Sequence, residues 1–202
     1  SVMTNEPYVL VLYYSTGGAT KSLAMEIARG IDSVSGIYPK IRTVPDIYSA
    51  HDNTAPFNAK SAHPFCAKEE LRLCSGLSMG SGTRFGNMAA QLKYFIDSTA
   101  EIWSGNQLEG KPASVFCSSS SMHGGQESTL LSMMIPLLHH GMVITGVPYS
   151  VRELGVTRTG GSPYGPSHVT GESKTFIELS QDEVEIARKA GERIARLALK
   201  LS

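Results

Sequence analysis

The stretch Tyr8-Val-Leu-Val-Leu-Tyr-Tyr14, followed at once by Ser15-Thr-Gly-Gly-Ala-Thr20, decides the fold of this chain. Its first seven residues form an unbroken aliphatic and aromatic run, which is typical of a strand buried on both faces of a parallel sheet. From Thr20 to Val34 the apolar residues recur at helical spacing, which predicts an amphipathic helix ending near Gly36. The stretch therefore predicts a strand, a glycine turn and a helix.

Strand and helix signals alternate along the rest of the chain. Apolar runs predict further strands at residues 40–44, 73–79, 113–117 and 142–147. Helical periodicity predicts helices around residues 88–96 and at residues 126–140, where Pro136 is expected to kink the last turns. This order predicts an α/β fold in which a doubly wound parallel sheet of about five strands carries helices on both faces.

A capping signal predicts a terminal helix. Ser180 and Glu183 fit the S-x-x-E box, in which each side chain accepts a hydrogen bond from a backbone N–H group at the helix start. The apolar residues that follow are expected to form the buried stripe of this helix, and these are Val184, Ala187, Ile194, Leu197 and Leu201.

Length and composition limit the class of protein. A chain of 202 residues suits one core, so residues 1–202 are expected to form a single domain. The 18 basic and 18 acidic residues balance, which argues against a nucleic-acid partner. The apolar run at residues 8–14 is too short to span a bilayer and lacks the features of a signal peptide, so we expect a soluble, cytoplasmic protein without membrane insertion.

Two segments lack periodicity, at residues 45–67 and 150–176. Long structureless loops are uncommon in compact domains, so both are candidates for subunit contacts. The three cysteines, Cys66, Cys74 and Cys117, show no C-x-x-C spacing and are expected to be structural thiols. We expect no metal site and no covalent nucleophile.

The loops after the first, third and fourth strands are expected to hold a ligand, because doubly wound sheets bind ligands at the carboxyl ends of strands beside the topological switch point. Residues 15–20 offer hydroxyls, two glycines and the N–H groups of a helix start, which suit a phosphate. They match neither the P-loop nor the G-x-G-x-x-G pattern, which favours the static phosphate of flavin mononucleotide (FMN) over a hydrolysed nucleotide. The alternative is that Ser15, Thr16 and Thr20 only form a turn and a helix cap.

Further motifs carry a resemblance to a known family. They are Thr83-Arg-Phe-Gly-Asn-Met88, Gly124-Gly-Gln-Glu127, His139-His-Gly-Met142 and Ser162-Pro-Tyr-Gly165. In this order, from Leu10 to the C-terminus, the chain resembles the WrbA family of flavodoxin-like NAD(P)H:quinone oxidoreductases. The resemblance implies FMN as cofactor, NADH or NADPH as electron donor, a quinone as acceptor and ping-pong hydride transfer. It also implies a homotetramer, assembled via dimers, whose sites borrow residues from neighbouring subunits.

The resemblance further implies which residues bind the cofactor and the substrate. Trp103 corresponds to a residue that lines the pocket where nicotinamide and quinone stack in turn. The phosphate loop corresponds to Ser15, Thr16, Gly17, Gly18, Ala19 and Thr20. The flavin ring contacts correspond to Thr83, Arg84, Phe85, Gly86 and Asn87, to Ser118, Ser119, Ser120, Ser121, Met122, His123 and Gly124, and to His139.

Several of these residues have a simpler interpretation. Histidines such as His139 and His140 interact favourably with a helix C-terminus, and a lone tryptophan such as Trp103 is more often a packing residue. Arg84 has the alternative of being a surface charge.

Two glycines depart from the family pattern. Gly17 stands where many members carry a larger residue near the nicotinamide, and Gly82 stands where a proline is usual. For the chain as a whole, the alternatives are a flavodoxin-type electron carrier and a flavin-binding regulatory protein.

Overall fold

The sheet is built around β1 (Tyr8–Tyr14), whose seven residues are all buried, as the apolar run predicts. β2 (Tyr38–Thr43) and β3 (Gly76–Gly82) flank it in parallel, and β4 (Pro112–Ser119) lies beyond β3. With β5 (Val143–Ile144) next to β4, the order β2-β1-β3-β4-β5 confirms the predicted doubly wound α/β sheet. The computed structural model describes residues 6–47, 62–171 and 178–202.

The fifth position of the sheet is shared by two short strands. β5 (Val143–Ile144) pairs with the start of β4, and β6 (Ser167–Val169) pairs with its end. The strand predicted at residues 142–147 is therefore too long. After β5 the chain leaves the sheet, because Val147 donates its N–H to Pro163 and Pro148 has no N–H to donate. It returns as β6 through a segment, predicted to be irregular, that also contains α6 (Glu153–Val156).

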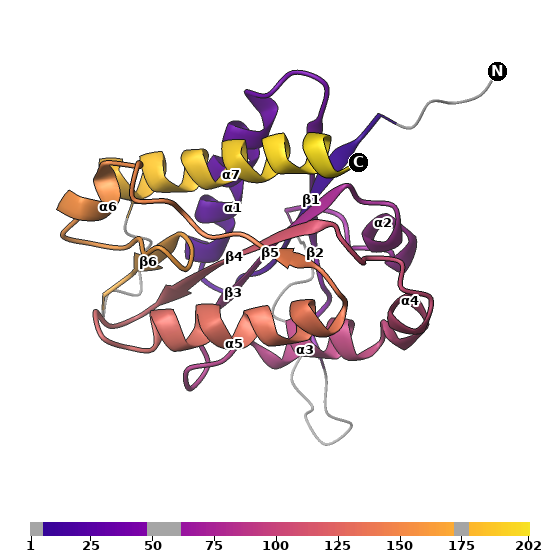
Figure 1. Cartoon of the computed structure of the whole chain (residues 1–202). Coiled ribbons are helices and arrows are strands. Elements are labelled where there is room, and N and C mark those ends of the chain that lie inside the picture. The colour runs from indigo at the N-terminus through magenta and orange to yellow at the C-terminus, as the bar shows by residue number, and fades with distance from the viewer. Residues whose placement is uncertain (1–5, 48–61, 172–177) are drawn as a thin grey trace.

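Helices cover both faces of the sheet (Figure 1). α1 (Ala19–Asp32) and α7 (Gln181–Leu201) pack on one face with Val9 and Val11 of β1. α3 (Ala90–Asp97) and α5 (Gln126–His139) pack on the other face with Leu10 and Leu12. Successive residues of β1 thus point into two separate apolar cores, as expected for a strand in the middle of a three-layer fold.

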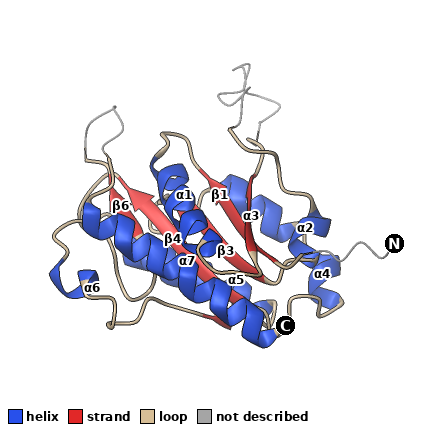
Figure 2. Cartoon of the chain, turned by 90° about the horizontal axis from the view of Figure 1, so that it is seen from above, coloured by secondary structure: helices blue, strands red, loops and turns tan. Residues whose placement is uncertain are grey.

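α1 and α7 cross closely over the sheet (Figure 2). A Cβ atom on Gly30 would collide with the backbone of Arg188, and one on Gly191 would collide with the carbonyl of Ile27. The two glycines therefore let the helix backbones touch. This contact locks α1, and with it the loop that precedes α1, against the C-terminal helix.

The capping box of α7 is confirmed, because the Ser180 hydroxyl accepts a hydrogen bond from the Glu183 N–H and the Glu183 carboxylate accepts one from the Ser180 N–H. The predicted stripe is only partly right, since Leu201 is exposed and Val184 and Leu197 are half-buried. Because α7 lies so close to α1, its buried face carries several small residues instead of large apolar ones. The buried face consists of Glu183, Ile186, Ala187, Ala190, Gly191, Ile194, Ala195 and Ala198.

Two short helices are a further difference from the predictions. α2 (Lys68–Arg72) was not predicted. The N–H groups of Leu73 and Cys74 donate back to α2, to the carbonyls of Glu69 and Leu71, so β3 begins at Gly76 rather than Leu73. α4 (Ala100–Ser104) likewise follows α3. Most of the segment predicted to be irregular at residues 45–67 lies outside the described residues. Within the described ranges, no helix has the length and apolar character needed to cross a membrane.

Candidate functional site

The loop between β1 and α1 has the form of an anion cradle. Gly18 is the N-cap of α1 with a φ of 94°, and no side chain caps the first turn. The Gly18 N–H donates to the Ser15 hydroxyl at 3.0 Å, which closes the loop. A Cβ atom on Gly17 or Gly18 would meet nothing within 4 Å, so open space lies above both glycines. The N–H groups of the first turn of α1 can therefore bind a phosphate, and the loop fits the monoester of FMN.

Ser118, the penultimate residue of β4, joins the three predicted loops. Its buried hydroxyl lies 2.8 Å from the hydroxyl of Thr20, the second residue of α1. Its carbonyl accepts a 2.7 Å hydrogen bond from the N–H of Thr83, the first residue after β3. The Thr83 hydroxyl in turn accepts a hydrogen bond from Thr129 of α5 at 3.2 Å. The structure thus brings these sequence-predicted segments together at the carboxyl edge of the sheet, beside the switch point.

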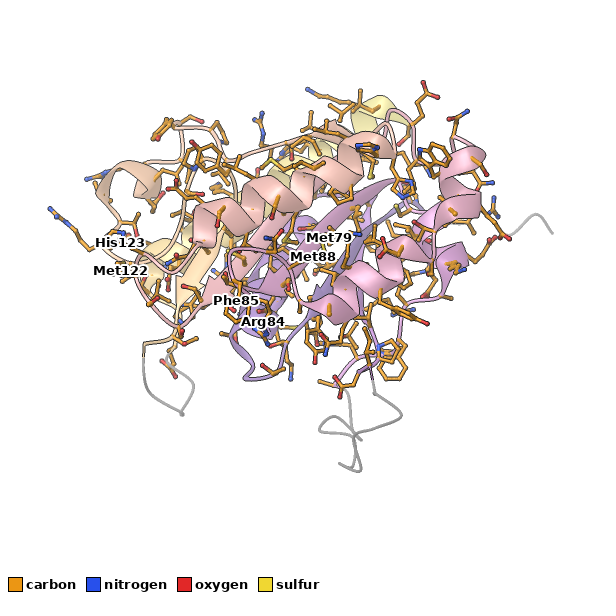
Figure 3. The ribbon with its side chains drawn as sticks, turned by 90° about the horizontal axis from the view of Figure 1, so that it is seen from below. Met79, Arg84, Phe85, Met88, Met122 and His123 are labelled. Carbon is orange, nitrogen blue, oxygen red and sulfur yellow. The ribbon has the colours of Figure 1, made fainter. Side chains whose placement is uncertain are left out.

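The loop after β3 places Arg84 and Phe85 at this edge (Figure 3). Arg84 pairs with Asn87 through backbone hydrogen bonds in both directions, and its guanidinium donates to the Thr16 hydroxyl at 3.4 Å. Phe85 adopts a φ of 50° and its side chain is fully exposed. An aromatic side chain held in the left-handed region and left in solvent is characteristic of a binding loop rather than a packing residue.

The loop after β4 is held by its own hydrogen bonds. The Ser119 hydroxyl donates to the Ser121 carbonyl, and the Gln126 amide donates to the carbonyls of Ser121 and Met122. Gly125, with a φ of 94°, caps α5, and a Cβ atom there would press on the backbone of Gly86. The loops after β3 and β4 therefore approach each other closely enough to form two sides of one site.

Trp103 and His139 lie elsewhere in the chain. Both line a cavity of 420 Å³ between α3, α4 and α5. α5 starts at the carboxyl edge of the sheet and runs back for about 21 Å, so His139 ends beside the start of β4 at the amino edge. The structure brings these two predicted residues together with each other, but not with Ser118 and the loops around it.

Burial shifts the pKa values of three further side chains, one imidazole and two thiols. His140 is buried next to the same cavity, its Nε2 lies 2.9 Å from the Thr99 hydroxyl, and burial lowers the pKa of the imidazole. Burial raises the pKa of Cys117 to about 12 and that of Cys74 to about 11. Both thiols therefore stay protonated near neutral pH, which agrees with the structural role predicted for them.

Sequence reasoning missed some residues at the site. Thr129 contacts Thr83 from the first turn of α5, and Lys21 follows the phosphate loop directly. On the outer side, the Tyr14 hydroxyl donates to Asp46 and the Tyr13 hydroxyl lies 2.7 Å from His63. Lys21, Tyr14 and Tyr13 lie within two positions of the predicted loop at residues 15–20, and this proximity was the signal that could have found them.

Comparisons with known proteins find relatives along almost the whole chain. Residues 7–153 match a family described as NADPH-dependent FMN reductase. The chain is 40% identical over 202 residues to an NAD(P)H dehydrogenase (quinone) of Solidesulfovibrio magneticus, covering 96% of this chain and 98% of that one. It is 42% identical to the protein of the same name from Geotalea daltonii, covering 96% and 97%.

Solved structures support the fold. A flavodoxin, WrbA-like protein from Agrobacterium tumefaciens superposes with a TM-score of 0.66 at 20% identity, covering 97% of this chain and 99% of that one. A flavodoxin from the domain Archaea gives a TM-score of 0.62 at 18% identity, covering 95% and 99%. The flavodoxin-like fold is therefore established.

Proposed function

The chain belongs to the family of NADPH-dependent FMN reductases, and from this premise we propose that it is an FMN-dependent NAD(P)H:quinone oxidoreductase of the WrbA type. The observation that carries the proposal is the junction of three loops at Ser118, directly beside an open, glycine-lined helix start. Relatives named NAD(P)H dehydrogenase (quinone) cover almost the full length of the chain, which supports the substrate class.

The residues that would hold FMN follow from the geometry. Residues 15–20 receive the phosphate, with the Thr16 hydroxyl and the N–H groups of α1 as donors. Residues 83–87 and residues 118–124 would hold the ring system between them. Bound there, FMN would supply the redox chemistry, namely hydride uptake from NADH or NADPH and two-electron reduction of a quinone.

The protein itself would balance charge and orient the ligands, and Arg84 and Phe85 are placed for these two roles. Arg84 already contacts Thr16, so its guanidinium is placed to balance negative charge near the phosphate or the reduced ring. Phe85 offers an exposed aromatic surface that suits a flat ligand. Donor and acceptor use the same place in turn, which gives ping-pong kinetics and requires no covalent nucleophile.

The proposal includes a homotetramer. Trp103 and His139 contribute to catalysis only if another subunit presents them, because one chain holds them at the edge opposite its own phosphate loop. The surface around them is suited to a second copy, since Ile135 and Leu138 on α5 and Tyr94 on α3 are exposed apolar side chains. A single cytoplasmic domain per subunit completes the proposal.

A titration tests this function. Purified apoprotein is titrated with FMN, then with NADH or NADPH, and finally with benzoquinone, while flavin absorbance is recorded. Repeated bleaching by the nicotinamide and recolouring by the quinone supports the enzyme. Absence of FMN binding overturns the proposal, and binding without turnover indicates the electron carrier or the regulatory protein instead.

A further inference from the structure

A second cavity adjoins the proposed flavin site. It has a volume of 430 Å³, which lies in the range of small-molecule sites. One wall is formed by the end of the loop after β4 and the start of α5, and the other by the segment that leads into β6. The lining residues are Met122, His123, Gly125, Gln126, Glu127, Ser128, Thr159, Gly160, Gly161, Ser162 and Ser167.

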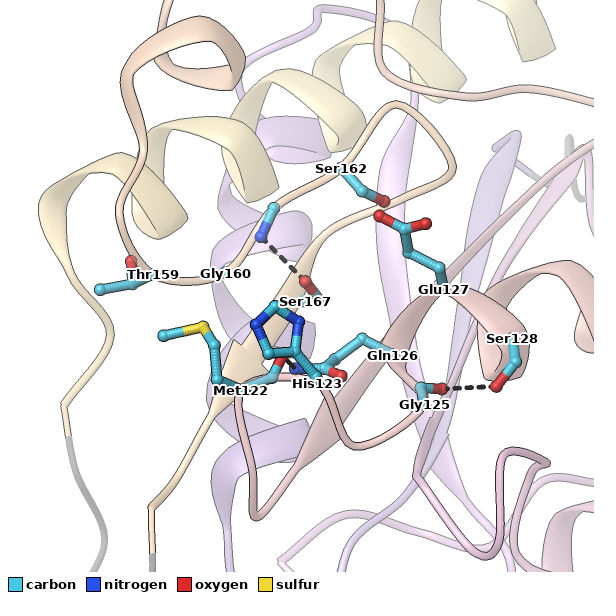
Figure 4. Close-up of a pocket in the computed structure, with 11 residues that line it drawn as sticks. Met122, His123, Gly125, Gln126, Glu127, Ser128, Thr159, Gly160, Ser162 and Ser167 are labelled. Atoms are coloured by element: carbon cyan, nitrogen blue, oxygen red, sulfur yellow. Dashed lines mark hydrogen bonds between the residues drawn. The ribbon is translucent and has the colours of Figure 1, made fainter.

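One loop borders both spaces. Residue Ser118 at its start faces Thr20 and Thr83 on the flavin side. Met122 and His123 near its end face the cavity, across from Gly160 (Figure 4). A long ligand whose one end stacks on the flavin can therefore place its other end in this cavity.

The wall that leads into β6 is rigid. The Gly160 N–H donates to the Glu183 carboxylate at 2.8 Å, and the Gly161 N–H donates to the Ser167 hydroxyl at 2.8 Å. The Thr159 hydroxyl lies 2.7 Å from that of Ser180, at the cap of α7. A Cβ atom on Gly160 would collide with the carbonyl of Ser167, so only glycine permits this path. The cavity is therefore preformed by the chain itself.

The opposite wall carries polar groups without partners. Within the described part of the chain, the Glu127 carboxylate and the His123 ring make no hydrogen bond or ion pair, and Figure 4 shows Glu127 turned toward Ser162. No lysine or arginine is among the described residues that line the cavity; Arg158 precedes the wall without lining it. Among its described residues, the lining therefore combines a carboxylate with the absence of any lysine or arginine side chain, so its charged group disfavours a second anion such as a 2′-phosphate.

We infer that this cavity binds the adenosine half of the nicotinamide donor and that Glu127 selects NADH over NADPH. A carboxylate accepts hydrogen bonds from the 2′- and 3′-hydroxyls of a ribose, whereas it repels a 2′-phosphate. The half-exposed Met122 provides a soft apolar surface for the adenine. This inference rests on the proposed function, and it deepens that function by naming the donor.

Steady-state kinetics with benzoquinone tests the assignment. The wild-type FMN-loaded protein is expected to use NADH with a kcat/KM about tenfold or more above that for NADPH, because a like charge at close range costs more than 1.4 kcal/mol. Glu127→Gln is expected to bring the kcat/KM for NADH closer to that for NADPH, and Glu127→Lys to make the kcat/KM for NADPH the larger of the two. The control Glu6→Gln changes an exposed carboxylate just before β1 and leaves the ratio unchanged.

Binding without turnover separates this inference from the proposed function. Calorimetry with ADP-ribose and with 2′-phospho-ADP-ribose measures the adenosine half alone on the FMN-loaded protein. Tighter binding of ADP-ribose, lost in Glu127→Lys, supports the assignment even if no quinone is reduced. Equal use of both donors, unaffected by Glu127→Lys, overturns it, as does a preference for NADPH that Arg158→Ala abolishes.

Discussion

The hydroxyl groups of Thr20 and Ser118 lie 2.8 Å apart in the interior, although 98 residues separate them in the chain. Each hydroxyl is withdrawn from water, so each depends on the other for its hydrogen bond. The pair ties the first turn of α1 to the end of β4. Because these two elements supply the proposed phosphate loop and one side of the proposed flavin site, the bond holds these two parts of the site in a fixed position relative to each other.

Replacement of Ser118 by alanine tests this role. We expect the free energy of unfolding to fall by about 1–2 kcal/mol, because Thr20 is left without its partner. We also expect FMN affinity to fall by about tenfold, since the phosphate loop loses its link to β4. Urea denaturation and fluorescence titration with FMN measure the two effects.

Ser114→Ala is the matched control. Ser114 is also a buried serine of β4, and its hydroxyl donates to the Ser78 hydroxyl at 3.1 Å, but it lies four residues nearer the amino edge. It should lose a similar amount of stability and keep its FMN affinity. Equal loss of affinity in both variants would show that the Ser118 hydroxyl has no special role.

The two glycines of the phosphate loop should respond differently to alanine. Gly18 has a φ of 94°, which costs an alanine about 1–2 kcal/mol, whereas the backbone of Gly17 lies outside that region and has open space beside it. Gly18→Ala is therefore expected to shift the α1 amides and weaken FMN binding. Gly17→Ala is expected to bind FMN with the affinity of the wild type. If both variants weakened FMN binding to a similar extent, the proposed geometry of the phosphate loop would be wrong.

The sequence predicted correctly those elements whose local signal and place in the tertiary structure require the same conformation. β1, α1 and the Ser180–Glu183 box appear as predicted, because a buried run, a helical stripe and a cap each carry their own signal. The split fifth strand was missed because three residues, Ser167–Val169, are too few to show a period, and only pairing with β4 makes them a strand.

The sequence predicted which loops form the candidate site but not where His139 lies. Loops that follow strands meet at one edge in any doubly wound sheet, so residues 15–20, 83–87 and 118–124 could be grouped in advance. His139 could not be placed by motif alone. Its position at the end of a 14-residue helix was the overlooked signal, because such a helix carries its last residue to the other edge.

The buried pair of His168 and Glu183 predicts a loss of stability in acid. Burial acts to raise the pKa of the Glu183 carboxyl, but hydrogen bonds from His168 and from the N–H groups of Ser180 and Gly160 outweigh it and lower the pKa below 4.5. A lowered pKa in the folded state contributes stability that is present above about pH 4.5 and is lost as the pH falls through the folded value. The free energy of unfolding, measured by urea denaturation, should therefore be lower at pH 4 than at pH 7.

Glu183→Gln should remove most of this effect. The variant is expected to lose about 3 kcal/mol at pH 7, because a buried histidine loses its anionic partner, and to depend less on pH below 4.5. Glu192→Gln removes ion pairs with Lys189 and Arg196 at the surface instead, and should cost less than about 1 kcal/mol. If Glu183→Gln keeps the acid sensitivity of the wild type, other groups are responsible for it.

Mixing of subunits tests whether sites are shared between chains. Gly18→Ala damages the phosphate loop and Trp103→Ala removes the aromatic side chain at the opposite edge, so each homo-oligomer should turn over slowly. When the two variants are dissociated and reassembled together, some sites combine an intact loop with an intact tryptophan from the neighbour. With equal amounts and random assembly, about a quarter of the sites are complete, and activity should recover to that fraction. Activity that stays at the mean of the two parents would place both residues in the site of one chain, which the helix geometry of α5 argues against.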